Sequence, residues 1–275
     1  MLDSIPELCL DVAPADRAWL EEGAARAARE GSVAIASLLP ALPRRIGRRA
    51  LGSDVAAVGS ARVDLRAWRA CDGAARLLLR DADDAAILDL FKHGDMEERT
   101  MLLRAASTRP LSPATVSLLG EVQRSNVQPH YEALVCDNDL LARASGAVAG
   151  FGQAEASRLV LKAAFLGLPM HRMLGVERLA NPELSRMLQD LATEREAAGR
   201  QVWPDTLAMM ARAPVPGTAA RALGDLEHGA DDRRAAAIAA LALLNREDLM
   251  PFLRERLPRE PKPQLRAALK QQTGV

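Results

Sequence analysis

Residues 226–242 read LEHGADDRRAAAIAALA, and residues 90–107 read LFKHGDMEERTMLLRAAS. Each segment ends one helical pattern with a His-Gly pair and then places an arginine, Arg234 or Arg99, six residues after the histidine. Acidic residues fill the first turn of the helix that follows, where the helix dipole favours negative charge. A repeated helix pair of this kind predicts helices that stack side by side.

The composition favours helices throughout the chain. Of its 275 residues, 49% are hydrophobic but only 3% are aromatic, so the core must be built from Ala, Leu, Val and Met. Ala and Leu are strong helix formers, and no convincing alternating strand pattern is present. We expect a loop over 47–63 and helices over 16–30, 32–42, 64–80, 83–93, 95–107, 112–125, 129–136, 139–149, 153–167, 182–198, 204–212, 217–228, 231–245, 247–257 and 262–272.

Short loops between consecutive helices favour antiparallel neighbours. We therefore predict an all-α fold of antiparallel helical hairpins, stacked as an irregular α-solenoid that resembles HEAT repeats. Residues 1–275 are expected to form a single helical-repeat domain. Its parts are the N-terminal helices and loop (1–63), a central region (64–212) and HEAT-like C-terminal helices (213–275).

The charge balance and the cysteines exclude several classes of protein. The formal net charge is +0, without the basic excess of a nucleic-acid-binding surface. Cys9, Cys71 and Cys136 have neither disulfide-framework nor zinc-site spacing, which favours a reducing, cytoplasmic compartment. The first residues are acidic where a signal peptide needs positive charge. No window approaches the ~18 uncharged apolar residues of a membrane span.

Two cations lie at unusual positions in the predicted helices. Lys162 projects from the nearly all-apolar helix 153–167, and Arg195 falls on the apolar stripe of helix 182–198. A buried ammonium must find a carboxylate, carbonyl groups or water. One interpretation is a ligand-facing cation in a cleft. The other is structural: an ion pair for Lys162, and for Arg195 a long stem over the core edge with its head in water.

The segment 159–200 contains the motifs of a known family. They are Lys162 on an apolar helix, Phe165-x-Gly167-x-Pro169, Gly175 with Arg178, Asn181-Pro-Glu-Leu184, and Glu194-Arg195 followed by Gly199-Arg200. Over residues 64–212, and most strongly over 124–204, the chain resembles the EboA family. The family's upstream segment often has an aromatic Asn-Pro-Tyr turn, where this chain has Asn138-Asp-Leu-Leu.

The resemblance implies a part in moving secondary metabolites out of the cytoplasm, as a member of a bacterial and algal gene cluster, but no established reaction. We expect the cations Lys162, Arg195 and Arg124 to line a cleft around helix 153–167. Neighbouring contributions are expected from Asn126, Tyr131, Glu194 and His171.

Tests for enzyme motifs are mostly negative. A magnesium-binding cluster is superficially matched by Asp83, Asp84 and Asp89. On a helix, however, Asp84 and Asp89 point about 140° apart and do not converge on one face. Asp83 and Asp84 are better explained as the start of a helix. No nucleophile elbow, phosphate-binding glycine loop or His-x-x-x-His pair is present. We therefore predict no catalytic residues, no metal and no cofactor.

The favoured hypothesis is a non-enzymatic cytoplasmic binding or scaffold protein of secondary-metabolite biosynthesis and trafficking or export. Its partners would be proteins or a small-molecule metabolite of the same pathway, and not nucleic acid. One alternative is an enzyme of unknown reaction that uses His171 or His130 with a carboxylate in a concave site. A pure scaffold with an exposed apolar patch and no pocket is the other.

Overall fold

The computed structural model of the protein describes residues 12–274. They divide into two compact units: unit 1 contains residues 12–156 and Arg172–Gly175, and unit 2 contains Ser157–His171 and residues 176–274. The first boundary falls within α11 (Gln153–Leu166). Helices dominate both units, as predicted. The prediction that residues 1–275 form a single helical-repeat domain stays a prediction. Cys9 and the acidic first residues, which the sequence analysis discussed, lie outside the described residues.

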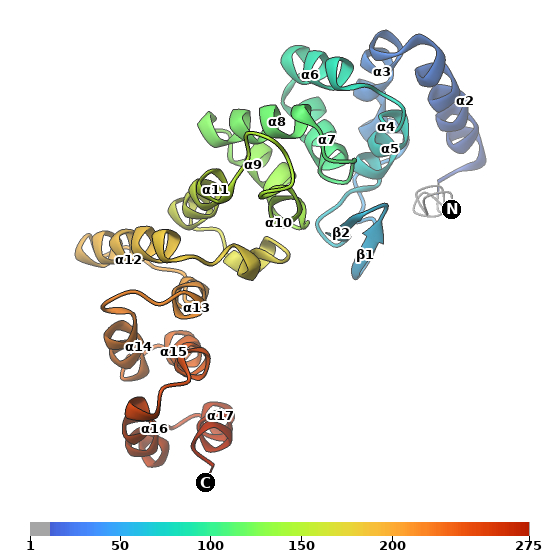
Figure 1. Cartoon of the computed structure of the whole chain (residues 1–275). Coiled ribbons are helices and arrows are strands. Elements are labelled where there is room, and N and C mark those ends of the chain that lie inside the picture. Colours follow the sequence, from blue (N-terminus) through green and yellow to red (C-terminus); the bar gives the residue numbers. More distant parts are fainter. Residues whose placement is uncertain (1–11, 275) are drawn as a thin grey trace. The chain divides into compact units, whose positions relative to one another are not determined.

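Unit 1 is built around α7, which contacts α5, α6, α8 and α9. On α7, Met101, Leu102 and Leu103 are completely buried or nearly so, and each stabilises the unit by roughly 2 kcal/mol. Asp83 caps α6 by accepting from the Ala86 N–H, as the helix-start interpretation predicted. The helices of unit 1 (Figure 1) are α2 (Pro14–Glu30), α3 (Ser32–Leu38), η1 (Leu39–Ala41), α4 (Leu42–Arg45), α5 (Ala70–Leu78), α6 (Asp84–His93), α7 (Met96–Ser107), α8 (Pro113–Arg124), α9 (Gln128–Val135) and α10 (Leu140–Ala144).

The predicted loop over 47–63 and the helix expected to start at Asp64 are wrong. The chain instead forms an antiparallel hairpin of β1 (Val55–Val58) and β2 (Ala61–Asp64), labelled in Figure 1. Its turn depends on Gly59, whose φ of 60° lies in the left-handed region that glycine tolerates best. Val58 and Val63 are buried, so the hairpin belongs to the core of unit 1.

The segment at Asn138 joins this hairpin to a distant part of the chain. Asn138 forms single-residue β-bridges to Val63 of β2 and to Met173. The preceding Asp137 has a φ of 61°, and its carboxylate accepts from Arg172 at 3.0 and 2.6 Å. These contacts hold Arg172–Gly175 in unit 1.

Unit 2 continues as consecutive helix pairs (Figure 1). Within the pairs, α12 packs on α13, α14 on α15 and α16 on α17. Between the pairs, α13 packs on α15 and α15 on α17. The elements are η2 (Met170–Arg172), which spans a unit boundary, η3 (Val176–Leu179), α12 (Pro182–Ala197), α13 (Asp205–Arg212), α14 (Thr218–Leu226), α15 (Asp231–Leu244), η4 (Glu247–Leu249), α16 (Met250–Arg256), η5 (Leu257–Arg259) and α17 (Pro263–Thr273).

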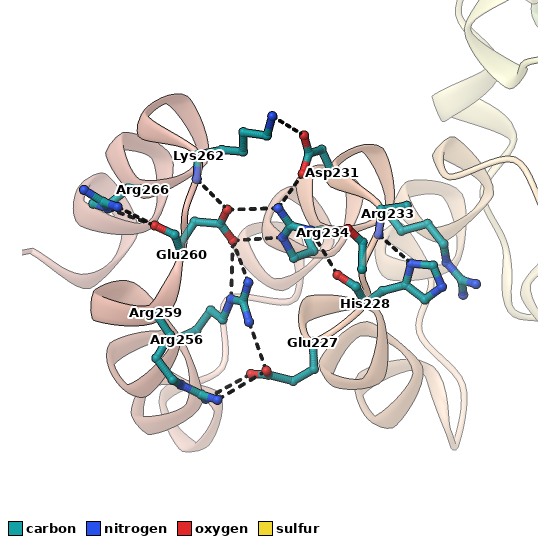
Figure 2. A network of polar contacts seen from close by, with 12 residues as sticks. Glu227, His228, Asp231, Arg233, Arg234, Arg256, Arg259, Glu260, Lys262 and Arg266 are labelled. Atoms are coloured by element: carbon teal, nitrogen blue, oxygen red, sulfur yellow. Dashed lines mark hydrogen bonds and ion pairs between the residues drawn. The ribbon is translucent and has the colours of Figure 1, made fainter.

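Buried charges connect two of these pairs (Figure 2). Glu260, which is 0% exposed, accepts from Arg234 of α15 at 2.9 and 3.1 Å and from Arg256 of α16 at 3.0 Å. Burial opposes ionisation of Glu260, but these hydrogen bonds and one from the Lys262 backbone N–H outweigh it and lower its pKa to about 2. The carboxylate therefore stays ionised although it is buried.

The two arginines of the sequence echo, Arg99 in unit 1 and Arg234 in unit 2, both donate hydrogen bonds to backbone carbonyl oxygens. Arg234 donates to the carbonyl oxygens of His228 and Gly229 at 3.0 and 2.8 Å, and Arg99 donates to that of Lys92 at 2.8 Å. Arg99 thus satisfies a carbonyl group in the last turn of α6, and Arg234 satisfies two in the connection that follows α14. The echo therefore has a common structural cause.

Candidate functional site

A hollow in unit 2 lies beside α12, and local sequence fixes where that helix begins. The side chain of Asn181 accepts from the Leu184 N–H at 2.9 Å, as its cap position predicted. Its amide also donates to Ser157 Oγ at 3.0 Å and to the Leu179 carbonyl at 2.9 Å. Three hydrogen bonds therefore anchor the start of the helix.

The hollow lies between α12, α14 and α15 and has a volume of about 370 Å³. This is within the range of small-molecule sites, roughly 300–1,000 Å³. Helix α12 contributes Gln189, Thr193 and Glu196 to its wall. The other side of the wall consists of Gly217, Arg221, Gly224 and Asp225 from α14 and its N-cap, with Arg233 from α15.

Two arginines and two acids form one connected network in this hollow. Arg221 donates to Glu196 at 2.9 Å and to the Thr193 hydroxyl at 2.9 Å. Arg233 donates to the other oxygen of Glu196 at 2.7 Å and also to Asp225. The four formal charges cancel, so the wall is strongly polar but carries no net charge.

The two acids of this network differ in their titration. Burial raises the pKa of Asp225, and the neighbouring Arg233 reduces that effect without reversing it. Burial also acts on Glu196, but hydrogen bonds from Arg221 and Arg233 prevail and its pKa is lowered. The contacts with both arginines therefore favour the ionised form of Glu196.

Glycines leave this hollow open. A Cβ added at Gly224 would meet no atom within 4 Å, so only the absence of a side chain keeps that part of the wall clear. Gly217 has a φ of 96° at the N-cap of α14, and a Cβ there would come within 2.8 Å of the Gln189 amide. Gly217 is thus required by the backbone, whereas Gly224 can be substituted.

One smaller, more apolar pocket adjoins the hollow, and a second adjoins the first. The first shares Arg221, Asp225 and Arg233 with the hollow and is also lined by Trp203. The second shares Trp203 and reaches Arg195. Each holds about 10 Å³, close to the space that one water molecule needs. They extend the surface beside α12 but leave the larger hollow as the ligand-sized space.

Four of the residues predicted from sequence belong to unit 2. Arg195 donates to the carbonyl oxygens of Gln201 and Phe165 at 2.7 and 3.1 Å. Lys162 is partly buried on α11, and burial lowers its pKa. Glu194 is exposed at the end of α12. The fourth, His171, lies at the surface.

The other three predicted residues belong to unit 1. Arg124 is 70% exposed and pairs with Glu121 at 2.6 Å, and Asn126 is exposed as well. Tyr131 is fully buried. A joint cleft of all seven residues stays a prediction, since three belong to one unit and four to the other.

The two histidines of the enzyme alternative are in different surroundings. His171 Nδ1 lies 3.5 Å from the Asp205 carboxylate, but its side chain is 77% exposed. His130 is buried, its Nε2 lies 3.2 Å from the Met96 carbonyl oxygen, and burial lowers its pKa. The histidine–carboxylate pair thus exists only at an exposed position among the residues that the structure describes.

Sequence reasoning missed the network of the hollow. Its members are separated by up to 37 residues along the chain and lie on three helices, so no local motif contains them. A weak signal existed in residues 216–225, PGTAARALGD, where glycines stand on either side of Arg221. Glycine at 224, inside a helix, is otherwise unfavourable.

The fold and the hollow together define a mostly helical protein with a polar site of small-molecule size. The family model described as "Metabolite traffic protein EboA" matches residues 8–211. This chain belongs to the EboA family, and the match extends the resemblance upstream from residue 64 to residue 8. Comparisons with curated proteins and with solved structures find no match.

The family match and the described residues place further bounds on the site. The match ends before Arg221 and Arg233, so it includes only the α12 side of the hollow. Among residues 12–274, no cluster of three or more His, Cys, Asp or Glu side chains is suited to hold a metal ion. No helix in that range has both the length and the apolar composition of a membrane span.

Proposed function

We propose that this protein binds a small polar metabolite in the hollow between α12, α14 and α15 and does not convert it. The observation that carries the proposal is the wall itself: about 370 Å³ bounded by two arginines and two acids that neutralise one another. The lining offers hydrogen bonds in quantity and contains no cysteine, serine or histidine. Its other candidate groups, the Thr193 hydroxyl and the carboxylates of Glu196 and Asp225, already accept from arginines. Such a wall is suited to holding a ligand.

The family description supports a carrier or scaffold in metabolite traffic. We propose that the protein works in the bacterial cytoplasm, in a pathway of secondary-metabolite biosynthesis and export. Partner proteins of that pathway would receive or deliver the ligand. The helix pairs of unit 2 would form a HEAT-like solenoid, in which Arg234 and Glu260 connect one pair to the next.

Substitution at Gly224 tests this site. Gly224→Trp places a large side chain where a Cβ meets nothing within 4 Å, so it should fill the hollow without disturbing α14. Ala239→Trp is the matched control, because Ala239 is an exposed residue of α15 and is not part of the wall. The full-length protein and both variants are purified from a producing cell, and bound small molecules are identified by mass spectrometry.

We expect one metabolite to accompany the unsubstituted protein and Ala239→Trp, and to be lost from Gly224→Trp. Equal recovery from all three proteins would show that the hollow is not the site. Recovery of a chemically converted metabolite after incubation would favour the enzyme alternative.

A second candidate site surrounds Lys162 and Arg195, which sequence analysis favoured. Arg195 lines the small pocket beside Trp203, which is the observation in its favour. If this site holds the ligand, Lys162→Ala and Arg195→Ala should abolish metabolite recovery while Gly224→Trp leaves it intact. The same mass-spectrometric measurement separates the two sites.

A further inference from the structure

We propose that the ligand of the hollow is an uncharged, polyhydroxylated molecule such as a sugar or a sugar alcohol. This inference rests on the proposed function and specifies the chemistry of the same site. It follows from how the charged groups of the wall are already paired and from the hydrogen-bonding capacity that they retain.

The existing pairs disfavour a charged ligand. An anion that approached Arg221 or Arg233 would also approach Glu196, which accepts from both of them. To bind either guanidinium fully, it would have to displace Glu196 or Asp225 and leave that carboxylate without its partner. An unpaired, partly desolvated carboxylate is costly. A zwitterion meets the same obstacle, because both of its charges compete with pairs that the protein already makes.

The unused capacity of the wall suits hydroxyl groups. A guanidinium has five N–H donors and an ionised carboxylate about four acceptor positions. Arg221 uses two donors on Glu196 and Thr193, and Arg233 directs one nitrogen at both Glu196 and Asp225. A hydroxyl both donates and accepts, so a ligand rich in hydroxyls can bind the remaining donors and acceptors together without breaking an ion pair.

An unsatisfied acceptor adds a second observation. Gln189 lines the hollow, and its side-chain nitrogen donates to the Pro216 carbonyl oxygen at 3.1 Å. Its Oε1 is buried and has no hydrogen-bond partner among the described residues. A buried acceptor without a partner is uncommon in folded proteins. A rotation of the Gln189 side chain that turns this oxygen toward the hollow would let a ligand hydroxyl donate to it and supply the missing bond.

The test compares probes of three charge types on the full-length protein by saturation-transfer NMR and calorimetric titration. Glucose and sucrose are uncharged, glucose 6-phosphate is anionic and glutamine is zwitterionic. We expect an uncharged probe to bind with a dissociation constant of about 1 mM or less. Its affinity should fall at least about tenfold in Gly224→Trp and remain unchanged in Ala239→Trp.

Salt gives an independent readout. Binding of the uncharged probe should be the same at low and high ionic strength, because no net charge is brought together. If glucose 6-phosphate or glutamine binds more tightly, and Gly224→Trp abolishes that binding, the inference is overturned but the hollow remains a ligand site. If neither sugar binds, the inference is overturned whatever metabolite the purified protein contains.

Discussion

Glu260→Gln should be among the most destabilising single substitutions in unit 2. Glutamine keeps the shape of the side chain but removes the charge that compensates Arg234, which is only 3% exposed. It also puts a donor group where Arg234 and Arg256 both need an acceptor. The perturbation is therefore electrostatic and confined to the connection between α15 and the last helix pair.

Two lines of reasoning give the same magnitude. The pKa of Glu260 falls from its ordinary 4.5 to about 2, which corresponds to about 3 kcal/mol of stabilisation when the carboxylate is ionised. Removing one partner of a buried ion pair typically costs about 3–5 kcal/mol. We therefore expect Glu260→Gln to lower the free energy of unfolding of unit 2 by about 3 kcal/mol at neutral pH.

The sign of the pH dependence follows from the lowered pKa. The stabilisation is complete above about pH 4.5, where Glu260 would be ionised even in the unfolded chain, and it is lost as the pH falls toward about 2. The difference in free energy of unfolding between the wild type and Glu260→Gln should therefore become smaller as the pH falls from about 4.5 to about 2. A protonated glutamic acid and a glutamine are then nearly equivalent.

Hydrogen exchange in increasing urea, followed by mass spectrometry, measures the opening free energy of α15 and α17 directly. Glu255→Gln is the control, since Glu255 is exposed on α16 and its pair with Arg259 is a surface contact. The reasoning fails if Glu260→Gln costs less than about 1 kcal/mol at neutral pH, or if its effect does not change between about pH 6 and about pH 3.

Three further substitutions or reactions have expected outcomes. Asn245 ends α15 with a φ of 45°, in the left-handed region that glycine tolerates and β-branched residues do not. In urea unfolding, Asn245→Gly should be neutral or slightly stabilising, whereas Asn245→Val should cost about 1–2 kcal/mol. Equal effects of the two substitutions would contradict this. Burial raises the pKa of Cys71 to about 11 and of Cys136 to about 12. In a Cys9→Ser background, both thiols should therefore resist iodoacetamide at about pH 8 until the protein unfolds. Rapid labelling of the native protein would refute their burial. Arg195→Ala should cost about 1 kcal/mol of stability through its two lost carbonyl contacts, and an unchanged melting temperature would argue against this role.

Helix ends were predictable because their causes are local. Asp83, Asp95 and Asn181 each cap a helix by accepting from the backbone N–H three residues further on, and the sequence alone places these residue types at those positions. The echo of Arg99 and Arg234 is local for the same reason, because each arginine reaches a carbonyl group only five to seven residues before it in the chain. Such interactions require no knowledge of the tertiary fold.

The hairpin and the hollow were missed for the opposite reason. The strands around Gly59 are four residues each and rich in alanine, so their alternation is weak, although a Gly-Ser turn between valine-containing segments is a hairpin signal. The network around Glu196 exists only because α14 and α15 bring Arg221 and Arg233 to the same carboxylate. Its composition depends on packing that no single segment encodes.

The clamp between Asp137 and Arg172 has a consequence for the connectivity of the molecule. Arg172–Gly175 belongs to unit 1, whereas the residues immediately before and after it belong to unit 2, so the backbone passes between the units three times. A single cut cannot separate the units, because any fragment that ends in α11 lacks the segment that Asn138 bridges. Unit 1 therefore needs sequence from both sides of the boundary in α11, and it is complete only in a polypeptide that continues to Gly175.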